Sequence, residues 1–340
     1  MPSSLRREKE VVGIVYFDKF HGISYLIIDI LQPNPLTMEL VIKNLSKTYP
    51  NGTRALKDIN LTIPKGMFGL LGPNGAGKSS LMRTIATLQE ADTGSIMLGD
   101  LDVLREKEAM RKVLGYLPQE FGVYPKVSAE EMLDHFAVLK GISDSSERKE
   151  VVKALLQQTN LYDVRKKNLG GYSGGMKQRF GIAQALLGNP KIIIVDEPTA
   201  GLDPAERNRF HNLLSEIGEN VIVILSTHIV EDVTDLCRNF AIINKGEVLL
   251  EGDPLQVIDS LRGRIWRKFI HKDELVQHQL QHEVISSRLF AGKTIIHVVS
   301  DVQPGPEFEA VAPDLEDVYF SKIHEAALRE RAEPAHEIMN

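Results

Sequence analysis

The sequence predicts an α/β fold with a largely parallel sheet, followed by a small α+β appendage. Two stretches, "KIIIVDEP" at 191–198 and "NVIVILSTH" at 220–228, are apolar runs bounded by turn residues or charges, as strands buried on both faces are. A third, at 67–88, reads as a short strand, a glycine-rich loop and a helix. Strands that alternate with helices in this way indicate a parallel sheet. After about residue 255, short strands are mixed with one polar helix, which indicates the appendage.

The composition is that of an ordinary globular protein. Of the 340 residues, 43% are hydrophobic and 25% are charged. The formal net charge of −6 is not the footprint of a nucleic-acid binder, so we expect no nucleic acid among the partners. The single cysteine, Cys237, excludes an internal disulfide framework, and we expect it to be a buried packing thiol.

Residues 1–37 are expected to form an extension outside the fold. The most apolar stretch there, at 11–31, is long enough to span a bilayer but contains two aspartates and a lysine. Each charge near a bilayer centre costs about 2.5–3.5 kcal/mol, so we expect no transmembrane segment. From Met38 onward, stretches 38–50 and 54–64 alternate like strands, with the turn "PNGT" between them. Helical spacing follows later, before and after "GISDSS".

The stretch "GPNGAGKSS" has the form of a phosphate-binding loop. It satisfies G-x-x-x-x-G-K-[ST], with the required strand before it and helix after it. Its backbone N–H groups would surround the β-phosphate of a nucleotide, Lys78 would bind the β- and γ-phosphate oxygens, and the Ser79 hydroxyl would ligate Mg²⁺. The alternative, a glycine-rich turn with a chance lysine, does not account for the flanking elements. The predicted cradle comprises Gly72, Pro73, Asn74, Gly75, Ala76, Gly77, Lys78, Ser79 and Ser80.

Two acidic residues follow a buried strand. The run "IIIV" places Asp196 and Glu197 at the C-terminal end of that strand, where ligands of open α/β sheets bind. We expect Asp196 to hold Mg²⁺, directly or through water, and Glu197 to act as general base toward the attacking water. The alternative is an ordinary acidic strand end. The presence of the phosphate-binding loop favours the functional interpretation.

A second glycine-rich stretch, "YSGGM" at 172–176, also leads into a helix. Ser173 with the N–H groups of Gly174 and Gly175 would offer an anion site without a lysine. The alternative is a helix N-cap of purely structural use.

The order of these motifs resembles that of the ATP-binding subunit of ATP-binding cassette (ABC) transporters. That family carries a P-loop, a Q-loop glutamine, an "LSGGQ"-type signature, a Walker B strand with its glutamate, a D-loop and a switch histidine. The resemblance covers roughly residues 38–255. It implies a P-loop NTPase fold of the ABC type, with a mixed sheet core and a helical signature subdomain. The corresponding residues here are Gln119 in the Q-loop, "AGLDP" at 200–204 in the D-loop, and His228 as the switch histidine.

The resemblance also implies a different role for each of the two glycine-rich stretches. In this family two subunits, identical or similar, face each other head to tail, and each signature caps the ATP held by the other's P-loop. Two departures occur here: Tyr172 replaces the usual leucine, and Met176 replaces the usual glutamine. Neither removes the serine or the glycines.

Further roles follow from the resemblance alone. Tyr49 would stack on adenine, although an aromatic residue in a strand is often a core residue. His228 would hydrogen-bond the γ-phosphate, and Gln119 would reach the Mg²⁺ and the attacking water. Asp203 would cross the dimer interface, where the usual "ALD" reads "GLD".

The C-terminal region narrows the subtype. "APDLEDVYF" at 312–320 resembles an element of ATPases that serve drug, antibiotic and lipid exporters with type 2 permeases. We expect an appendage over 256–322 and a charged, fraying tail over 323–340. The expected function is an ATPase that drives export through a separate transmembrane permease. The protein would then lie at the cytoplasmic face of the cell membrane, bound through that permease.

Several alternatives stay open. A soluble ABC ATPase acting on ribosomes or DNA would usually carry two cassettes or a long coiled coil, and the sequence shows neither. A P-loop kinase has no use for a signature motif. A GTPase would need an N-K-x-D type motif to recognise guanine, and "NKGE" at 244–247 is a poor match to it. A cassette that binds ATP without hydrolysing it would not need Glu197 and His228. Elsewhere, His278 and His282 have a spacing that could bind metal, but a solvated helix face is favoured. "RGRIWRKF" at 262–269 is expected to be a solvated strand or to pack its tryptophan.

Overall fold

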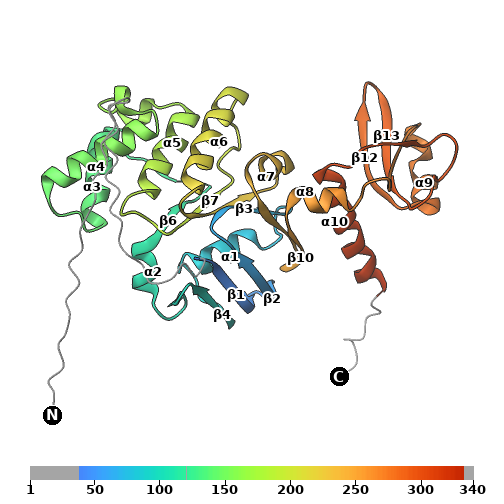
Figure 1. The fold of residues 1–340 in the computed structure, drawn as a ribbon, viewed down its shortest axis with the longest axis horizontal. Helices are drawn as coiled ribbons and strands as arrows, with labels where there is room; N and C mark the ends of the chain where they lie inside the picture. Colours follow the sequence, from blue (N-terminus) through green and yellow to red (C-terminus); the bar gives the residue numbers. More distant parts are fainter. Residues whose placement is uncertain (1–37, 120, 333–340) are drawn as a thin grey trace, which may run out of the picture. The chain divides into compact units, whose positions relative to one another are not determined.

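The computed structural model describes residues 38–119 and 121–332 (Figure 1). The predicted extension 1–37 and the last eight residues of the predicted tail lie outside these ranges. Within the described ranges, no helix combines the length and the apolar character that crossing a membrane requires.

A six-stranded sheet forms the centre of the fold. Its strand order is β10-β9-β3-β8-β7-β6, and all neighbours are parallel except β10, which pairs antiparallel with β9. The apolar runs predicted as buried strands are β7 and β8, whose residues are all buried. The strands are β3 (Gly66–Leu71), β6 (Leu114–Leu117), β7 (Ile192–Asp196), β8 (Ile222–Thr227), β9 (Asn239–Asn244) and β10 (Glu247–Gly252).

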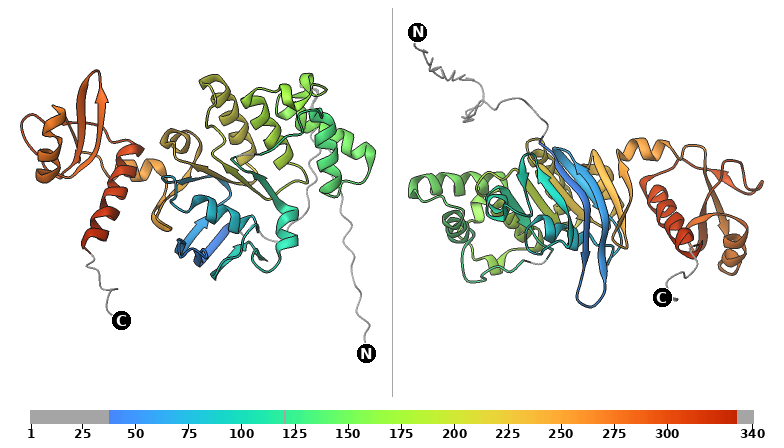
Figure 2. Two further views of the ribbon diagram at one scale, coloured as in Figure 1. Left: turned by 180° about the vertical axis from the view of Figure 1, so that it is seen from behind. Right: turned by 90° about the horizontal axis from the view of Figure 1, so that it is seen from below.

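A separate antiparallel sheet contains the N-terminal strands. Its order is β2-β1-β4-β5, and β1 pairs with both β2 and β4. The sheet packs with α1 against one face of the central sheet, and Leu40, Phe68 and Met82 belong to the shared core. The two layers are seen in Figure 2. The elements are β1 (Leu40–Thr48), β2 (Arg54–Ile63), α1 (Lys78–Ile85), β4 (Thr93–Leu98), β5 (Leu101–Asp102) and α2 (Lys107–Val113).

Helices cover the other face of the central sheet. Phe210 of α6 and Val233 of α7 pack there with Cys237, which is buried as expected. A second helical cluster has its own apolar core around Phe180 and Leu133, and it contains the two predicted helices as α3 and α4. These helices are α3 (Ala129–Leu139), α4 (Ser145–Gln158), α5 (Gly174–Ala185), α6 (Pro204–Gly218) and α7 (Val230–Leu236), with 3₁₀ turns at Tyr162–Val164 and Leu169–Gly171.

The C-terminal region is a four-stranded antiparallel sheet with helices, as expected for an α+β appendage. The sheet order is β12-β13-β11-β14. Trp266 is a packing residue: it lies against a small core, and its indole N–H donates to the Ser300 carbonyl at 2.9 Å. The elements are α8 (Pro254–Asp259), β11 (Ile265–Ile270), a 3₁₀ turn (Lys272–Glu274), α9 (Leu275–Gln281), β12 (Val284–Phe290), β13 (Lys293–Val299), β14 (Glu309–Ala310) and α10 (Leu315–Ala332).

Two sequence expectations in this region need correction. Helix α10 continues to Ala332, so the segment expected to fray from residue 323 begins inside a helix. Ile323 still packs against the core shared with α6 and α7, which explains why the helix does not end there. The favoured solvated face for His278 and His282 is also wrong, because the two rings stack on each other and both lie edge-on to Phe308.

Candidate functional site

The glycine-rich loop between β3 and α1 leaves the start of α1 without a side-chain cap. Gly77 is the N-cap residue and has φ 109°, a left-handed conformation that favours glycine. A Cβ at Gly77 would also lie 2.5 Å from the Ala55 carbonyl oxygen. The first backbone N–H groups of α1 therefore receive no side-chain acceptor at the N-cap, and an anion is their natural ligand.

Lys78 points back over this loop. Its ammonium donates to the carbonyl oxygens of Gly72 at 2.6 Å and Pro73 at 3.1 Å, and the residue is only 5% exposed. Burial lowers the pKa of Lys78 below its ordinary value, although the Glu197 and Asp196 carboxylates act in the opposite direction. The lysine thus places a poorly solvated positive charge beside the loop, where a phosphate would bind strongly.

A cleft of about 820 Å³ opens beside the loop. It brings together predicted residues from distant parts of the chain, including Tyr49, Gln119 and Glu197. The Tyr49 hydroxyl lies 3.0 Å from the Ser80 hydroxyl and donates to the Gln89 side-chain oxygen at 2.9 Å, so the ring is held at the cleft wall. Its predicted stacking on adenine stays a prediction. The lining comprises Tyr49, Gly52, Thr53, Arg54, Ala55, Lys57, Asn74, Gly75, Ala76, Gly77, Lys78, Ser79, Ser80, Gln119, Glu197, Lys245 and Gly246.

Glu197 lies between the other two predicted catalytic side chains. One carboxylate oxygen accepts from the Gln119 amide at 3.1 Å, and the other is 3.2 Å from His228 Nδ1. Glu197 has φ 46°, a left-handed conformation that costs a non-glycine residue about 1–3 kcal/mol. Its backbone N–H donates to the Ser226 carbonyl at 2.9 Å, which helps to hold this conformation. This conformation is one of several positive-φ positions in the described residues, and here it belongs to a carboxylate that lines the cleft.

Asp196 is the buried member of the acidic pair. Burial raises its pKa, and the neighbouring Glu197 carboxylate adds to the effect. A bound cation would reverse this effect. The predicted Mg²⁺ ligands Asp196, Ser79 and Gln119 offer only oxygen donors, which Mg²⁺ prefers, and Mg²⁺ commonly takes one or two protein ligands with phosphates and water. The residues therefore fit a Mg²⁺ ion that is also bound to a nucleotide. A site built by the protein alone is a different matter: in the described part of the chain, no cluster of three or more histidine, cysteine or acidic side chains could hold a metal.

The signature residues do not line this cleft. Ser173 is the N-cap of α5 and accepts from the Met176 N–H at 3.2 Å. Gly174 faces open space: a Cβ built there meets no atom within 4 Å. Tyr172 is buried, and its hydroxyl donates to the Val164 carbonyl at 3.0 Å, so the tyrosine that replaces the family's leucine serves the helical core.

The signature helix is tied to the helix that follows the D-loop. Glu206 of α6 forms ion pairs with Arg179 of α5 and with Arg209 of its own helix. Gly175 lies so close to the Glu206 carboxylate that a Cβ would collide with it. Asp203 is exposed and caps α6 by accepting from the Glu206 N–H at 2.9 Å, and its predicted role across a dimer interface stays a prediction.

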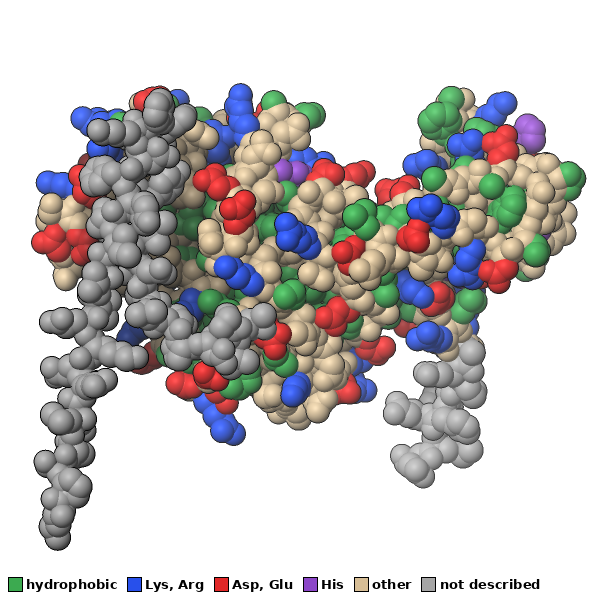
Figure 3. Space-filling model, viewed as in Figure 1, with side chains coloured by type: hydrophobic (Ala, Val, Ile, Leu, Met, Phe, Trp, Pro, Cys, Tyr) green, Lys and Arg blue, Asp and Glu red, His purple; other side chains and the backbone are tan. Residues whose placement is uncertain are grey.

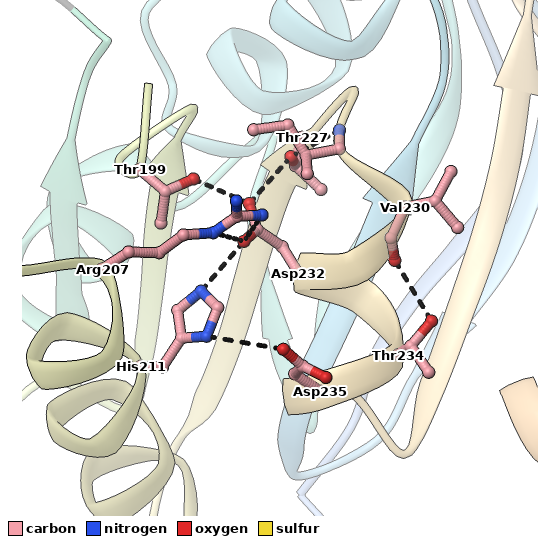
Figure 4. A network of polar contacts seen from close by, with 9 residues as sticks. Thr199, Arg207, His211, Thr227, Val230, Asp232, Thr234 and Asp235 are labelled. Carbon is pink, nitrogen blue, oxygen red and sulfur yellow. Dashed lines mark hydrogen bonds and ion pairs between the residues drawn. The ribbon is translucent and has the colours of Figure 1, made fainter. Parts of the chain in front are cut away.

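One buried carboxylate beside the site was not identified from the sequence. Asp232 on α7 is fully buried and accepts hydrogen bonds from the segments that carry Glu197 and His228 (Figure 4). Its position four residues after His228 was the only available signal. An acidic residue on a short helix is usually exposed, so the sequence alone does not reveal such a role.

Comparisons with known proteins match this geometry. A family model described as ABC transporter matches residues 56–200. The chain is 32% identical to the uncharacterized ABC transporter ATP-binding protein YxlF of Bacillus subtilis, over 84% of this chain and 99% of YxlF. It is 30% identical to the linearmycin resistance ATP-binding protein LnrL of the same organism, over 76% of this chain and 91% of LnrL. The probable multidrug ABC transporter ATP-binding protein YbhF of Escherichia coli is 30% identical over 86% of this chain, which spans about half (53%) of YbhF.

Solved structures show the same fold. The ATP-binding cassette MJ0796, in a dimeric post-hydrolysis state bound to ADP and Pi, has a TM-score of 0.57 and 27% identity, covering 63% of this chain and 98% of that chain. The cbiO1 protein of Clostridium perfringens, part of an ABC transporter complex, has a TM-score of 0.60 and 27% identity, covering 72% of this chain and 96% of that chain. On fold, site and sequence together, the chain belongs to the ATP-binding proteins of the ABC transporter family.

Proposed function

We propose that residues 38–255 form an ATP-hydrolysing motor that drives export through a separate transmembrane permease. The observation that carries this proposal is the placement of Glu197 between Gln119 and His228 at the cleft that Lys78 and Ser79 line. The presence of Glu197 and His228 together argues against a cassette that binds ATP without hydrolysing it.

Each residue then has a defined task. The P-loop N–H groups and Lys78 bind the phosphates, and Lys78 exchanges its two carbonyl partners for phosphate oxygens. A Mg²⁺ ion held by Ser79 and Asp196 would neutralise charge on the β- and γ-phosphates. Glu197 orients the attacking water and accepts its proton, while Gln119 and His228 direct the carboxylate and contact the γ-phosphate side of the cleft.

The proposal includes a dimer with a second copy or a similar ATPase. Support comes from the exposed signature: Gly174 and Asp203 are both exposed, and neither lines this chain's own cleft. Gly174 lies at the start of α5, where backbone N–H groups attract an anion, whereas Asp203 is an exposed carboxylate that caps α6. A second subunit would bring the nucleotide on its P-loop to the signature, and Asp203 would face that subunit across the interface.

The permease partner would dock in a groove of about 300 Å³ beside the helical cluster. The groove joins strand β6 to the ends of α3 and α5, and its rim exposes Leu88 (61%) and Leu139 (69%). Large exposed apolar side chains around a concavity are typical of a protein-binding site. The groove is lined by Ala86, Leu88, Arg111, Leu114, Gly115, Tyr116, Phe136, Leu139, Lys140, Gln184, Ala185 and Leu187.

Export and a location at the cytoplasmic face of the membrane are supported by the relatives, whose names refer to multidrug transport and linearmycin resistance. The alternative of a soluble ATPase acting on ribosomes or DNA finds no support among these relatives. On the face drawn in Figure 3, acidic and basic side chains are interspersed outside the grey atoms, unlike the basic stripe of a nucleic-acid binder.

Two experiments test the proposal. Glu197→Gln should bind ATP, hydrolyse it at least about 100-fold more slowly and accumulate as a dimer. A monomer by light scattering under saturating ATP would contradict the dimer. Affinity purification from gently solubilised cells should recover a polytopic membrane protein, and Leu139→Glu should abolish that recovery. Leu280→Glu in α9, at a leucine that is also exposed (84%) but lies far from the groove in sequence, is the control and should leave the recovery unchanged. Recovery of ribosomes instead would overturn the export proposal.

A further inference from the structure

A single buried carboxylate connects three functional segments. Asp232 on α7 is 0% exposed, and Figure 4 shows side chains from β8, from the turn after β7 and from α6 converging on it. Its Oδ2 accepts from the hydroxyls of Thr199 at 2.7 Å and Thr227 at 3.2 Å. Its Oδ1 accepts from the Arg207 guanidinium at 2.7 and 2.9 Å and lies 2.9 Å from His211 Nε2.

Thr227 transmits this contact to the switch histidine. Its hydroxyl donates to Asp232 and accepts from the Ile229 N–H at 2.9 Å. His228 lies between Thr227 and Ile229, so both of its chain neighbours are fixed by one hydroxyl. Asp232 is thus linked through one hydroxyl to the backbone on both sides of His228, whose Nδ1 lies 3.2 Å from a Glu197 carboxylate oxygen.

The other partners of Asp232 belong to the general-base and D-loop segments. Thr199 follows Glu197 by two residues. Arg207 and His211 lie on α6, the helix that begins after Asp203. The carboxylate thus joins the Glu197 turn, the His228 loop and the first turns of the D-loop helix at one point.

The bonding pattern exceeds what charge neutralisation requires. Burial alone would raise the pKa of Asp232, but hydrogen bonds from His211, Thr199 and Arg207 outweigh it and hold the pKa below its ordinary value. Arg207 already pairs with Oδ1 and neutralises the carboxylate. If Asp232 only stabilised the fold, any hydrogen-bond donor would serve for Oδ2. Instead, Oδ2 is bonded to two hydroxyls, one from each segment that carries a predicted catalytic residue.

We propose that Asp232 is a positioning residue for ATP hydrolysis, which acts through Thr227 on His228 and through Thr199 on the Glu197 turn. Because Arg207 and His211 share the same carboxylate, a shift of α6 at the D-loop moves both catalytic segments together. The inference rests on the roles proposed above for Glu197 and His228.

The test removes one hydroxyl without changing shape. Thr227→Val should lower kcat about 10-fold and leave the KM for ATP within about 2-fold, whereas Thr227→Ser, which keeps the hydroxyl, should retain most of the activity. Thr234→Val is the control of the same chemistry: among the described residues its hydroxyl bonds only to the Val230 carbonyl on the same helix, so kcat should be unchanged. Melting temperatures measured in parallel separate positioning from folding. Equal kcat values for Thr227→Val and the wild type would overturn the proposal.

A double mutant identifies the route. If Thr227 acts through His228, Thr227→Val should cost nothing further in a His228→Ala background. If instead the two substitutions lower kcat by factors that multiply in the double mutant, Thr227 does not act through His228, and the proposal that the protein is an ATPase still stands. Failure of the ATPase proposal itself would show differently, as undiminished hydrolysis by Glu197→Gln.

Discussion

Two glycine-rich loops of this chain each lead into a helix, but they have opposite surroundings. The loop before α1 is folded over Lys78, which is buried and bonded to the loop's own carbonyls, and its N-cap glycine provides no side-chain cap. The loop before α5 has Ser173 as a capping side chain and Gly174 in open space. The first loop meets the requirements of a phosphate site within one chain, with N–H groups and a cation. The second offers N–H groups alone, and only a ligand brought from outside can use them.

The difference shows that a motif's chemistry depends on what surrounds it. Both loops would attract an anion through the helix start. Only the first has a cation and a cleft, and it is the one expected to hold the nucleotide in the absence of a partner.

Lys78→Ala should have the largest effect. Without the ammonium, the β- and γ-phosphates lose their only buried cation in the loop, and we expect ATP affinity or turnover to fall at least about 100-fold. Isothermal titration with Mg·ATP and a phosphate-release assay measure the two quantities. Wild-type affinity and turnover in this variant would show that the cleft is not the nucleotide site.

The two signature glycines should separate partner contact from internal packing. Gly174→Ala places a Cβ in open space, so its melting temperature should stay equal or rise slightly, since alanine favours a helix by roughly 0.5–1 kcal/mol. Its ATPase activity should nevertheless fall about 10-fold or more, because the Cβ would meet the other subunit's phosphate. Thermal unfolding and phosphate release on one preparation provide both readouts.

Gly175→Ala is the comparison variant. Its Cβ would collide with the Glu206 side chain, which must then shift and weaken its ion pair with Arg179. We expect this cost to offset the gain in helix propensity, so the melting temperature should lie below that of Gly174→Ala. For the first variant, Gly174→Ala, full ATPase activity would contradict the prediction. It would mean that the signature loop does not approach a nucleotide, and that the two loops do not differ in the way proposed.

Tyr172→Leu, which restores the residue usual in the family, should have the smallest effect. The substitution leaves the half-buried Val164 carbonyl without its donor and should lower the free energy of unfolding by about 1 kcal/mol. ATPase activity should change less than about 2-fold, because the tyrosine side chain points into the helical core. Urea denaturation and turnover measure these effects; a large loss of turnover with unchanged stability would assign the tyrosine to the dimer interface instead.

The sequence predicted the central elements well because their signals are local. Strand β7 is a run of apolar residues that ends in Asp196, and the strand, loop and helix around Lys78 follow one another without a gap. The meeting of Gln119, Glu197 and His228 was predicted only through the family resemblance. No periodicity indicates which strand ends become neighbours.

Features that depend on tertiary packing were missed. A separate sheet for the N-terminal strands follows from pairing between β1 and β4, about fifty residues apart, which no local pattern shows. The stacked pair of His278 and His282 looked like a polar helix face, because Phe308, which covers both rings, is distant in sequence. Asp232 was missed for the same reason: its partners lie on three other segments.

The buried position of Cys237 has a practical consequence for watching this protein at work. It is the only thiol in the chain, and burial raises its pKa, so alkylating reagents should reach it only when the core opens. The rate of alkylation then reports opening of the core around β3 and α7. Mg·ATP that binds the folded protein should slow the alkylation of Cys237, and the size of this decrease measures the binding free energy without any added probe. A cysteine introduced on the surface, for instance at an exposed D-loop position, could be labelled with a fluorophore while the native thiol stays silent.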